Sequence, residues 1–324
     1  MRYQNKYNGI LLTELQELRS FLYTIPVFSI MLFIVLLFTS CNPQPKATGP
    51  KYSDVPSSQT IPVYHFAVHP LHNPTKLTET YQPLMDYLNE KLKTAQLTLE
   101  PSIDYANFEE KYTKRGPDFL LPNPWQTIQA MKLGYSVIAM AGRPDDFKGI
   151  FIVRRDNDIR HPSDLKGKAV SYPAPTALAA CIMPQYFLHK QGIDINADIE
   201  NKYVGSQESS IMNVYLGKTV AGATWPPPWR AFQKNFPVEA AQMKVIWETE
   251  PLINNSVMVR NDVPADVSGL VQKFLLELYE IPEGKMILSD IETARFLPAN
   301  NNDYGIVKTY IERFEKEVRK VETK

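Results

Sequence analysis

Residues 171–186 read SYPAPTALAACIMPQY, and this stretch decides how the rest of the chain is interpreted. It follows a short strand-like run at 168–170, breaks at Pro173 and Pro175, and continues after Thr176 as a run of small residues with helical character. Prolines keep a chain extended before a helix starts, and threonine is an accepted N-cap residue. The stretch therefore predicts a strand, a loop and a helix whose first N–H groups face an anion or polar ligand. The same pattern also fits an ordinary connection whose alanines only pack on a sheet.

Strand-like and helix-like segments alternate along the rest of the chain. Strands are expected at 62–68, 96–100, 117–121, 136–141, 149–154, 168–170, 202–204, 220–223, 245–249 and 256–260. Helices are expected at 77–92, 108–114, 125–133, 177–183 and 209–217, and over most of the tail from 268. This alternation with short apolar strands is typical of an α/β protein with largely parallel sheets.

The composition and the motifs exclude several classes of function. Lys+Arg and Asp+Glu both number 35, and no basic stripe stands out, so nucleic acid is not an expected partner. The chain has no GxSxG, HExxH, CxxC or Gly-rich phosphate loop, so neither an enzyme nor a cofactor is expected. His69 and His72 share a loop without a carboxylate at ligand spacing, so no metal site is expected. His69 instead lies at a strand's carboxyl end, where open α/β sheets place ligands.

An apolar run near the N-terminus, IPVFSIMLFIVLLF at 25–38, indicates a targeting segment. It is shorter than the ~20 residues of a membrane-spanning helix. The small residues directly before Cys41 resemble a bacterial lipoprotein signal, in which the cysteine is lipidated after cleavage. We therefore expect a signal peptide at 1–40, a lipid anchor on Cys41 and a flexible tether at 41–60, with an uncleaved anchor as the alternative. Both place the body outside the cytoplasmic membrane, in the periplasm or at the cell surface.

Aromatic residues follow three of the expected strands. Asn123 and Trp125 follow one strand, Tyr172 follows another, and Trp225 and Trp229 flank three prolines after a third. Rings at three strand exits would form the walls of a ligand cleft, and the prolines would make one wall stiff. Each ring taken alone also fits ordinary burial in a core.

Several short passages carry a resemblance that covers nearly all of residues 61–324. They are FAVHP at 66–70, YQPLMDYL at 81–88, DFLLPNPW at 118–125, DLKGK at 164–168, PQYFL at 184–188, VGS at 204–206 and FLPA at 296–299. In this order they resemble the phosphate/phosphite/phosphonate-binding family of ABC-transporter periplasmic solute-binding proteins, in its lipoprotein form.

The resemblance implies a two-lobed α/β fold of the type II periplasmic-binding-protein class. Each lobe would hold a mixed, mostly parallel sheet flanked by helices, and two crossover strands would join the lobes. The first lobe would comprise 61–149 plus 251–324, and the second 150–250. Such a protein binds a small polar or anionic solute, phosphonate-like by family, by hinge closure. It acts as a monomer with ABC permease and ATPase subunits. The alternatives are a ligand-sensing protein that signals to a membrane receptor, and an enzyme on the same scaffold.

The resemblance also carries over a binding site at the start of the central helix. Relatives present a Ser-Thr-Ser-Gly-like hydroxyl cluster there, which falls on Ala177-Leu178-Ala179-Ala180 in this chain, and a His that is here Gln207. Backbone N–H groups at 177–179 would still hold an oxyanion. A larger organic solute stacked on tryptophan rings is the alternative. The predicted ligand-binding residues are His69, Asn123, Trp125, Tyr172, Thr176, Ala177, Leu178, Ala179, Gln207, Trp225 and Trp229.

Overall fold

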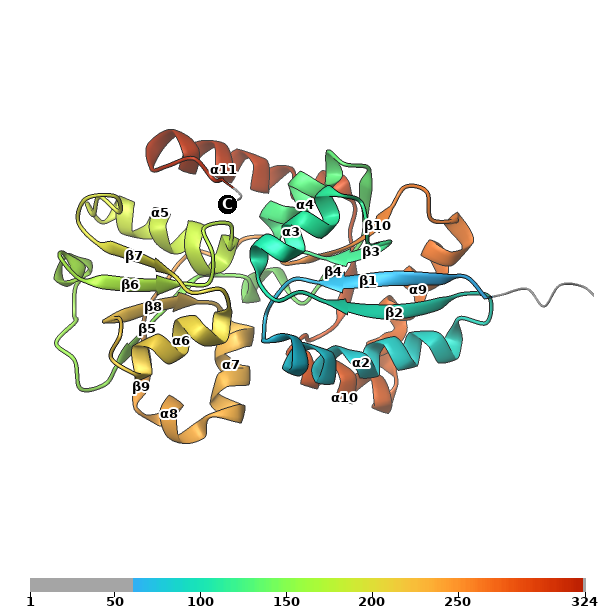
Figure 1. Cartoon of the computed structure of the whole chain (residues 1–324), viewed down its shortest axis with the longest axis horizontal. Coiled ribbons are helices and arrows are strands. Elements are labelled where there is room, and N and C mark those ends of the chain that lie inside the picture. Colours follow the sequence, from blue (N-terminus) through green and yellow to red (C-terminus); the bar gives the residue numbers. More distant parts are fainter. Residues whose placement is uncertain (1–60, 323–324) are drawn as a thin grey trace, which may run out of the picture. The chain divides into compact units, whose positions relative to one another are not determined.

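Strands and helices alternate throughout residues 61–322, which are the residues that the computed structural model describes. The expected signal peptide, Cys41 and tether lie outside the described residues. Two mixed sheets, each flanked by helices, organise this part of the chain (Figure 1). We call each sheet with its helices a lobe. No helix within 61–322 has both the length and the apolar character needed to cross a bilayer.

The first lobe is built on a six-stranded sheet in the order β11-β4-β10-β3-β1-β2. Its strands are β1 (Val63–Val68), β2 (Gln96–Pro101), β3 (Phe119–Leu121), β4 (Tyr135–Ala141), β10 (Ser256–Arg260) and β11 (Phe296–Pro298). Its helices are α2 (Pro74–Lys91), α3 (Tyr105–Thr113), α4 (Pro124–Met131), α9 (Ala265–Glu277), α10 (Pro282–Asp290) and α11 (Gly305–Glu317). Short 3₁₀ turns lie at Leu278–Glu280 and Asn301–Tyr304.

The second lobe is built on a five-stranded sheet in the order β7-β6-β8-β5-β9. Its strands are β5 (Ile150–Arg154), β6 (Ala169–Tyr172), β7 (Glu200–Tyr203), β8 (Ala221–Thr224) and β9 (Met243–Glu248). Its helical segments are the 3₁₀ turn Pro162–Leu165, the π-helix η3 (Leu178–Ile182), α5 (Met183–Lys190), α6 (Gln207–Tyr215), α7 (Pro226–Asn235) and α8 (Pro237–Ala241).

The sheets are mixed, but parallel pairs do not predominate as the sequence suggested. β1 pairs in parallel with β2 and β3, and β6 pairs in parallel with β7 and β8. All pairings of β10 and β5 are antiparallel. Each of these two strands enters its sheet directly from the other lobe, so it runs against the strands joined by helical connections.

Two helices differ from what apolar periodicity predicted. α2 begins at Pro74 because the Asn73 side chain accepts the Lys76 N–H, and Pro83 lies inside this helix rather than near its start. The triple proline at 226–228, expected as a stiff wall, is instead the first turn of α7. Proline is tolerated there because the first N–H groups of a helix have no partner within the helix.

Two linkers, residues 142–149 and 249–255, join the lobes and are hydrogen-bonded to each other. The Leu252 N–H donates to the Phe147 carbonyl at 2.8 Å, and the Thr249 N–H donates to the Gly149 carbonyl at 2.9 Å. The side chain of Asn254 adds a bond to the Arg143 carbonyl at 2.9 Å. The linkers therefore form a paired hinge rather than two independent strands.

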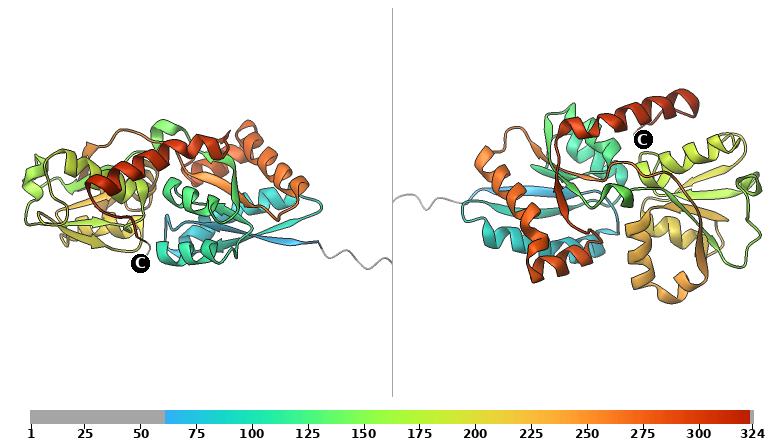
Figure 2. Two further views of the ribbon diagram at one scale, coloured as in Figure 1. Left: turned by 90° about the horizontal axis from the view of Figure 1, so that it is seen from above. Right: turned by 180° about the vertical axis from the view of Figure 1, so that it is seen from behind.

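The C-terminal helix makes a third connection between the lobes. α11 packs on α4 of the first lobe, and its far end lies beside α5 of the second (Figures 1 and 2). Glu317 accepts hydrogen bonds from Lys190 at 2.6 Å and from the Tyr186 hydroxyl at 3.0 Å. Arg319 donates to Gln185 at 2.8 Å.

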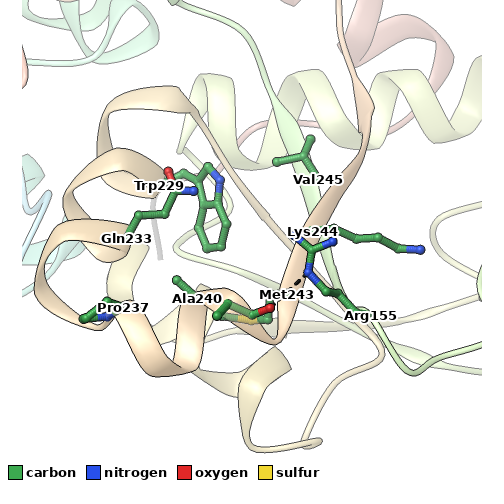
Figure 3. A pocket seen from close by; sticks show the side chains of 9 residues that line it. Arg155, Trp229, Gln233, Pro237, Ala240, Met243, Lys244 and Val245 are labelled. Atoms are coloured by element: carbon green, nitrogen blue, oxygen red, sulfur yellow. Dashed lines mark hydrogen bonds between the residues drawn. The ribbon is translucent and has the colours of Figure 1, made fainter.

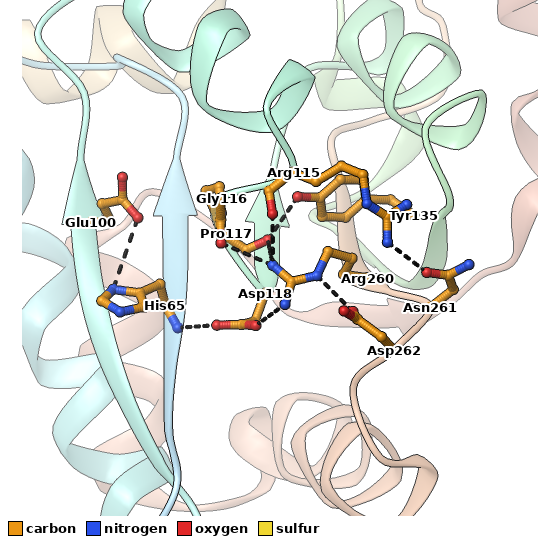
Figure 4. Close-up of polar contacts among 10 residues, drawn as sticks. All are labelled: His65, Glu100, Arg115, Gly116, Pro117, Asp118, Tyr135, Arg260, Asn261 and Asp262. Atoms are coloured by element: carbon orange, nitrogen blue, oxygen red, sulfur yellow. Dashed lines mark hydrogen bonds and ion pairs between the residues drawn. The ribbon is translucent and has the colours of Figure 1, made fainter.

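One partly buried ion pair ties the base of the first sheet together (Figure 4). Arg260 donates to the Asp118 carboxylate at 2.6 Å and to the carbonyls of Arg115, Gly116 and Pro117. Asp118 also accepts the His65 N–H at 2.7 Å. One guanidinium thus holds the turn before β3 against the end of β10.

Replacing Arg260 with Met should lower the free energy of unfolding by about 2–3 kcal/mol, because Asp118 and three carbonyls lose their donor. Urea unfolding measures this loss. The control is Lys114→Met, which removes an exposed ion pair with Glu110 and should cost nothing measurable. Equal losses of unfolding free energy in the two variants would show that Arg260 does not stabilise the contact between β3 and β10.

Candidate functional site

A cavity of about 10 Å³ lies where the two lobes meet, with space for roughly one water molecule. Both lobes and both linkers contribute to its wall. The lining residues are His69, Tyr105, Asn123, Phe147, Ala177, Leu178, Ala179, Ala180, Gln207, Trp225 and Asn255. Among the described residues, its wall includes no carboxylate, lysine or arginine, so a charged ligand there would meet neutral side chains and backbone dipoles.

The second lobe contributes the start of the central helix to the cavity. Ala177 is extended, with φ −71° and ψ 100°, and η3 begins at Leu178 and runs directly into α5. The first intrahelical bond recorded is from the Ile182 N–H to the Ala177 carbonyl, at 3.1 Å. The N–H groups of residues 178–181 precede that bond, so the helix start offers donors and the positive end of its dipole.

Thr176 does not cap this helix as the sequence suggested. No side chain caps η3, and the Thr176 hydroxyl donates to Glu109 in α3 of the first lobe at 2.5 Å. The Thr176 carbonyl accepts a bond from the Asn123 side chain at 3.2 Å. The hydroxyl donates to a buried carboxylate of the opposite lobe, which is a strong acceptor, and its oxygen does not accept a helix N–H.

Glu109 is buried at this interface and accepts a second bond, from the Gln126 side chain at 3.0 Å. Burial raises the pKa of Glu109, and the bonds from Thr176 and Gln126 offset part of that effect. The carboxyl group therefore makes a contact between the lobes whose strength depends on its protonation.

The first lobe contributes an uncharged histidine. His69 follows β1, and its Nδ1 lies 2.8 Å from the Leu121 carbonyl oxygen. Burial lowers the pKa of His69 to about 4, so the ring is neutral near pH 7. A carbonyl oxygen can only accept, so Nδ1 carries the proton and Nε2 is a hydrogen-bond acceptor.

Gln207 and two aromatic rings complete the wall. The Gln207 amide donates to the Tyr105 hydroxyl across the lobes at 2.9 Å and accepts from Thr224 at 2.8 Å. The rings of Phe147 and Trp225 lie with centroids 5.3 Å apart and planes tilted by 57°. The rings occupy space between the lobes, which keeps the cavity small in this arrangement.

The structure brings seven of the predicted ligand-binding residues to this cavity: His69, Asn123, Ala177, Leu178, Ala179, Gln207 and Trp225. Thr176 directly precedes the cavity-lining Ala177 and makes the hydrogen bonds with Asn123 and Glu109 described above. Tyr172 is fully buried next to Tyr203, with ring centroids 6.0 Å apart, and does not line the cavity.

The other two tryptophans lie elsewhere. Trp125 borders a hollow beside α11. Trp229 stacks on Phe232 and faces a hollow with Arg155 and Lys244 on the outer side of the second lobe (Figure 3). α7 begins directly after Trp225, and one helical turn carries Trp229 away from the cleft. The idea of a larger solute stacked on several tryptophans therefore loses its geometric support.

Four lining residues were not among those predicted: Tyr105, Phe147, Ala180 and Asn255. Asn255 directly precedes β10, a strand whose bounds were expected correctly, so a polar residue at that strand end was the available signal. Phe147 lies in a linker, and only the path of that linker decides which side it faces. Within residues 61–322, no group of three or more His, Cys, Asp or Glu side chains could hold a metal ion.

Gly149 packs directly beneath the helix start. A Cβ at this position would come within 2.5 Å of the Ala179 carbonyl oxygen and 2.8 Å of Pro184. Gly149→Ala should therefore shift the helix start and lower the free energy of unfolding by about 1–3 kcal/mol. Urea unfolding measures this loss. Gly269→Ala, in an open part of α9, is the matched control and should be neutral or stabilising by up to about 1 kcal/mol.

Glu109→Gln keeps an acceptor for Thr176 and Gln126 but cannot ionise. Because the folded pKa of Glu109 is raised above its ordinary 4.5, the native protein binds more protons than the unfolded chain between these two values. The contribution of Glu109 to stability is thus present at low pH and is lost as pH rises through that window.

The stability of Glu109→Gln relative to the native protein should therefore increase as pH rises above about 4.5, measured by urea unfolding. Glu110→Gln is the control on the same helix. Lys114 lowers the pKa of Glu110, but this ion pair is exposed, so Glu110→Gln should match the native protein across the same pH range. A flat profile for Glu109→Gln would show that burial does not perturb Glu109.

The fold resembles solved structures of solute-binding proteins. A binding protein component of an ABC phosphonate transporter from Pseudomonas aeruginosa matches with a TM-score of 0.73 and 16% identity, covering 79% of this chain and 87% of that one. PhnD1 from Prochlorococcus marinus MIT 9301, solved with methylphosphonate, matches with a TM-score of 0.71 and 20% identity, covering 78% and 98%. At these identities the likeness shows the fold, which is the type II periplasmic-binding-protein fold.

A sequence comparison finds a probable ABC transporter phosphite binding protein, PhnD1 of Prochlorococcus marinus MIT 9301. The two are 23% identical over 184 residues, which is 52% of this chain and 61% of the relative. The alignment thus spans less than two thirds of that relative's length.

A family model gives the broadest match. The model described as "ABC transporter, phosphonate, periplasmic substrate-binding protein" matches residues 66–304, well over half of the chain. This range begins within β1 and includes both linkers, the helix start and every residue that lines the cavity. The chain therefore belongs to the family of phosphonate-binding periplasmic substrate-binding proteins of ABC transporters.

Proposed function

We propose that this protein captures a small phosphorus oxyanion, such as a phosphonate or phosphite, between its lobes for an ABC importer. The observation that carries the proposal is the cavity between the lobes, where N–H groups of the helix start face uncharged polar side chains of the first lobe. Such a helix start binds anions through backbone donors and its dipole, without needing a cationic side chain. The absence of any carboxylate from the described wall of the cavity favours an anionic solute over a cationic one.

Binding would proceed by hinge closure at the paired linkers. Clamp contacts of Asn123 and Glu109 with Thr176 hold the lobes together in the present arrangement. A phosphonate needs more room than the cavity of about 10 Å³ gives, so the lobes would part slightly to admit and hold it. The closed form would then be recognised by the permease, with transport driven by the ATPase subunit.

Lipid attachment at Cys41 would keep the body near the permease on the outer side of the membrane, as a tethered monomer. The protein would bind and release its solute unchanged, without a reaction. Its family membership supports this role, since the family consists of substrate-binding components of transporters.

Isothermal titration calorimetry of the full-length protein with phosphite, methylphosphonate and phosphate tests the proposed solute class. At least one should bind, and at about 100 times its dissociation constant it should stabilise the protein by about 2.7 kcal/mol in thermal unfolding. If none of the three binds, the proposed solute class is wrong.

Restoring hydroxyls at the helix start should strengthen binding. Ala177 and Ala179 line the cavity, so Ser at both positions would add two hydrogen bonds to an oxyanion there. Each is worth about 0.5–1.5 kcal/mol, and the double variant should therefore bind about tenfold more tightly or better. Ala139→Ser, equally buried in β4 but away from the cavity, is the control and should leave affinity unchanged. Equal affinity in the double variant would place the anion elsewhere.

A further inference from the structure

Asn255 has a buried carboxamide that the fold does not use. The residue is 3% exposed, lines the cavity between the lobes, and directly precedes β10. Its side-chain oxygen has no hydrogen-bond partner among residues 61–322. Buried polar side chains are normally paired because an unpaired one costs free energy, so an unpaired amide facing a cavity points to a ligand.

The neighbouring Asn254 shows what a structural asparagine looks like at the same linker. It is equally buried, its nitrogen donates to the Arg143 carbonyl at 2.9 Å, and its oxygen accepts the Asn255 N–H at 2.8 Å. Asn254 therefore joins the two linkers. Asn255 makes no such contact with its side chain, so maintaining the hinge does not explain it.

His69 presents a second polar atom to the same cavity. Its Nδ1 is engaged by the Leu121 carbonyl, which leaves Nε2 as the acceptor of a ring that lines the cavity. A neutral imidazole in this tautomer can only accept a hydrogen bond at Nε2. The Asn255 carboxamide, in contrast, can present its oxygen or, after a half-turn, its NH₂ group.

His69 and Asn255 line the same cavity as the helix start of the second lobe. The π-helix η3 and α5 together form one continuous helix over residues 178–190, and the N–H groups of its first turn can hold deprotonated oxygens. The first-lobe side offers an obligatory acceptor in His69 and an adaptable amide in Asn255. The helix start therefore requires hydrogen-bond acceptors on the solute, whereas His69 requires a hydrogen-bond donor.

We infer, resting on the function proposed above, that His69 and Asn255 form a subsite that recognises a hydrogen-bond donor on the anionic group of the solute. The solute that fits is a singly protonated oxyanion, whose deprotonated oxygens face the helix start and whose P–OH donates to His69. A sulfonate has the same tetrahedral shape but no proton, so it would set a lone pair against Nε2. The subsite therefore selects phosphonate or phosphite monoanions over sulfonates.

The test compares methylphosphonate with methanesulfonate by calorimetry on the full-length protein, at a slightly acidic pH where methylphosphonate keeps one proton. We expect methylphosphonate to bind at least about tenfold more tightly, since leaving a buried acceptor unpaired costs about that factor or more. Equal affinities would overturn the inference and leave the proposed function standing. Failure of every phosphorus oxyanion to bind the native protein would overturn both.

Two variants test the residues separately. Asn255→Leu should weaken methylphosphonate binding about tenfold to hundredfold while leaving the unfolding temperature unchanged or raised, because no internal hydrogen bond is lost. Asn255→Ala serves the same purpose if the Leu variant does not fold. His69→Phe keeps an aromatic ring beside Tyr105 and Phe108, and should abolish the preference for phosphonate over sulfonate.

Asn254→Leu is the matched control. It breaks two internal hydrogen bonds, so it should lower the unfolding temperature but leave the preference for phosphonate over sulfonate unchanged. If Asn255→Leu and Asn255→Ala bind methylphosphonate as the native protein does, Asn255 does not contact the solute. If they instead lower the unfolding temperature as Asn254→Leu does, its role is structural.

Discussion

The arrangement of the site depends on two hydrogen bonds between the first lobe and Thr176. Asn123 holds the Thr176 carbonyl and Glu109 holds its hydroxyl, so the loop before the central helix is fixed by residues of the opposite lobe. Asn123 also caps α4 by accepting the N–H groups of Trp125 and Gln126. One asparagine thus caps a first-lobe helix and holds a second-lobe loop, which fixes the helix start against the first lobe.

The chemistry of the cavity follows from the neutrality of its wall. Within residues 61–322 no charged side chain lines the cavity, so the favourable terms for an anion are backbone N–H groups and the helix dipole. Uncharged acceptors limit how many lone pairs a solute can present there. Such a wall discriminates by protonation state as well as by charge. The paired linkers and the end of α11 add further contacts between the lobes, so this arrangement of the lobes rests on several separate contacts.

Much of the fold could be predicted from sequence because apolar periodicity and turn residues are local properties. The strand at 256–260 was expected with its observed bounds, and most others to within one or two residues. β11 was not expected as a strand because three residues carry no period, and α7 was missed because three prolines usually end regular structure. The antiparallel pairing of β5 and β10 depends on how linkers enter each sheet, which no local pattern contains.

The sequence by itself determined the α/β class, the family and the position of the central helix start, because each depends on residues close together in the chain. Only the tertiary structure decided which side chains share the cavity. Trp229 lies one helical turn beyond Trp225 and borders a different hollow. Thr176 donates to Glu109, sixty-seven positions away, and the side-chain oxygen of Asn255 has no partner within residues 61–322. Contacts between distant residues depend on how sheets, linkers and helices pack, and a hydrogen bond of this kind leaves no mark on the local sequence of either partner.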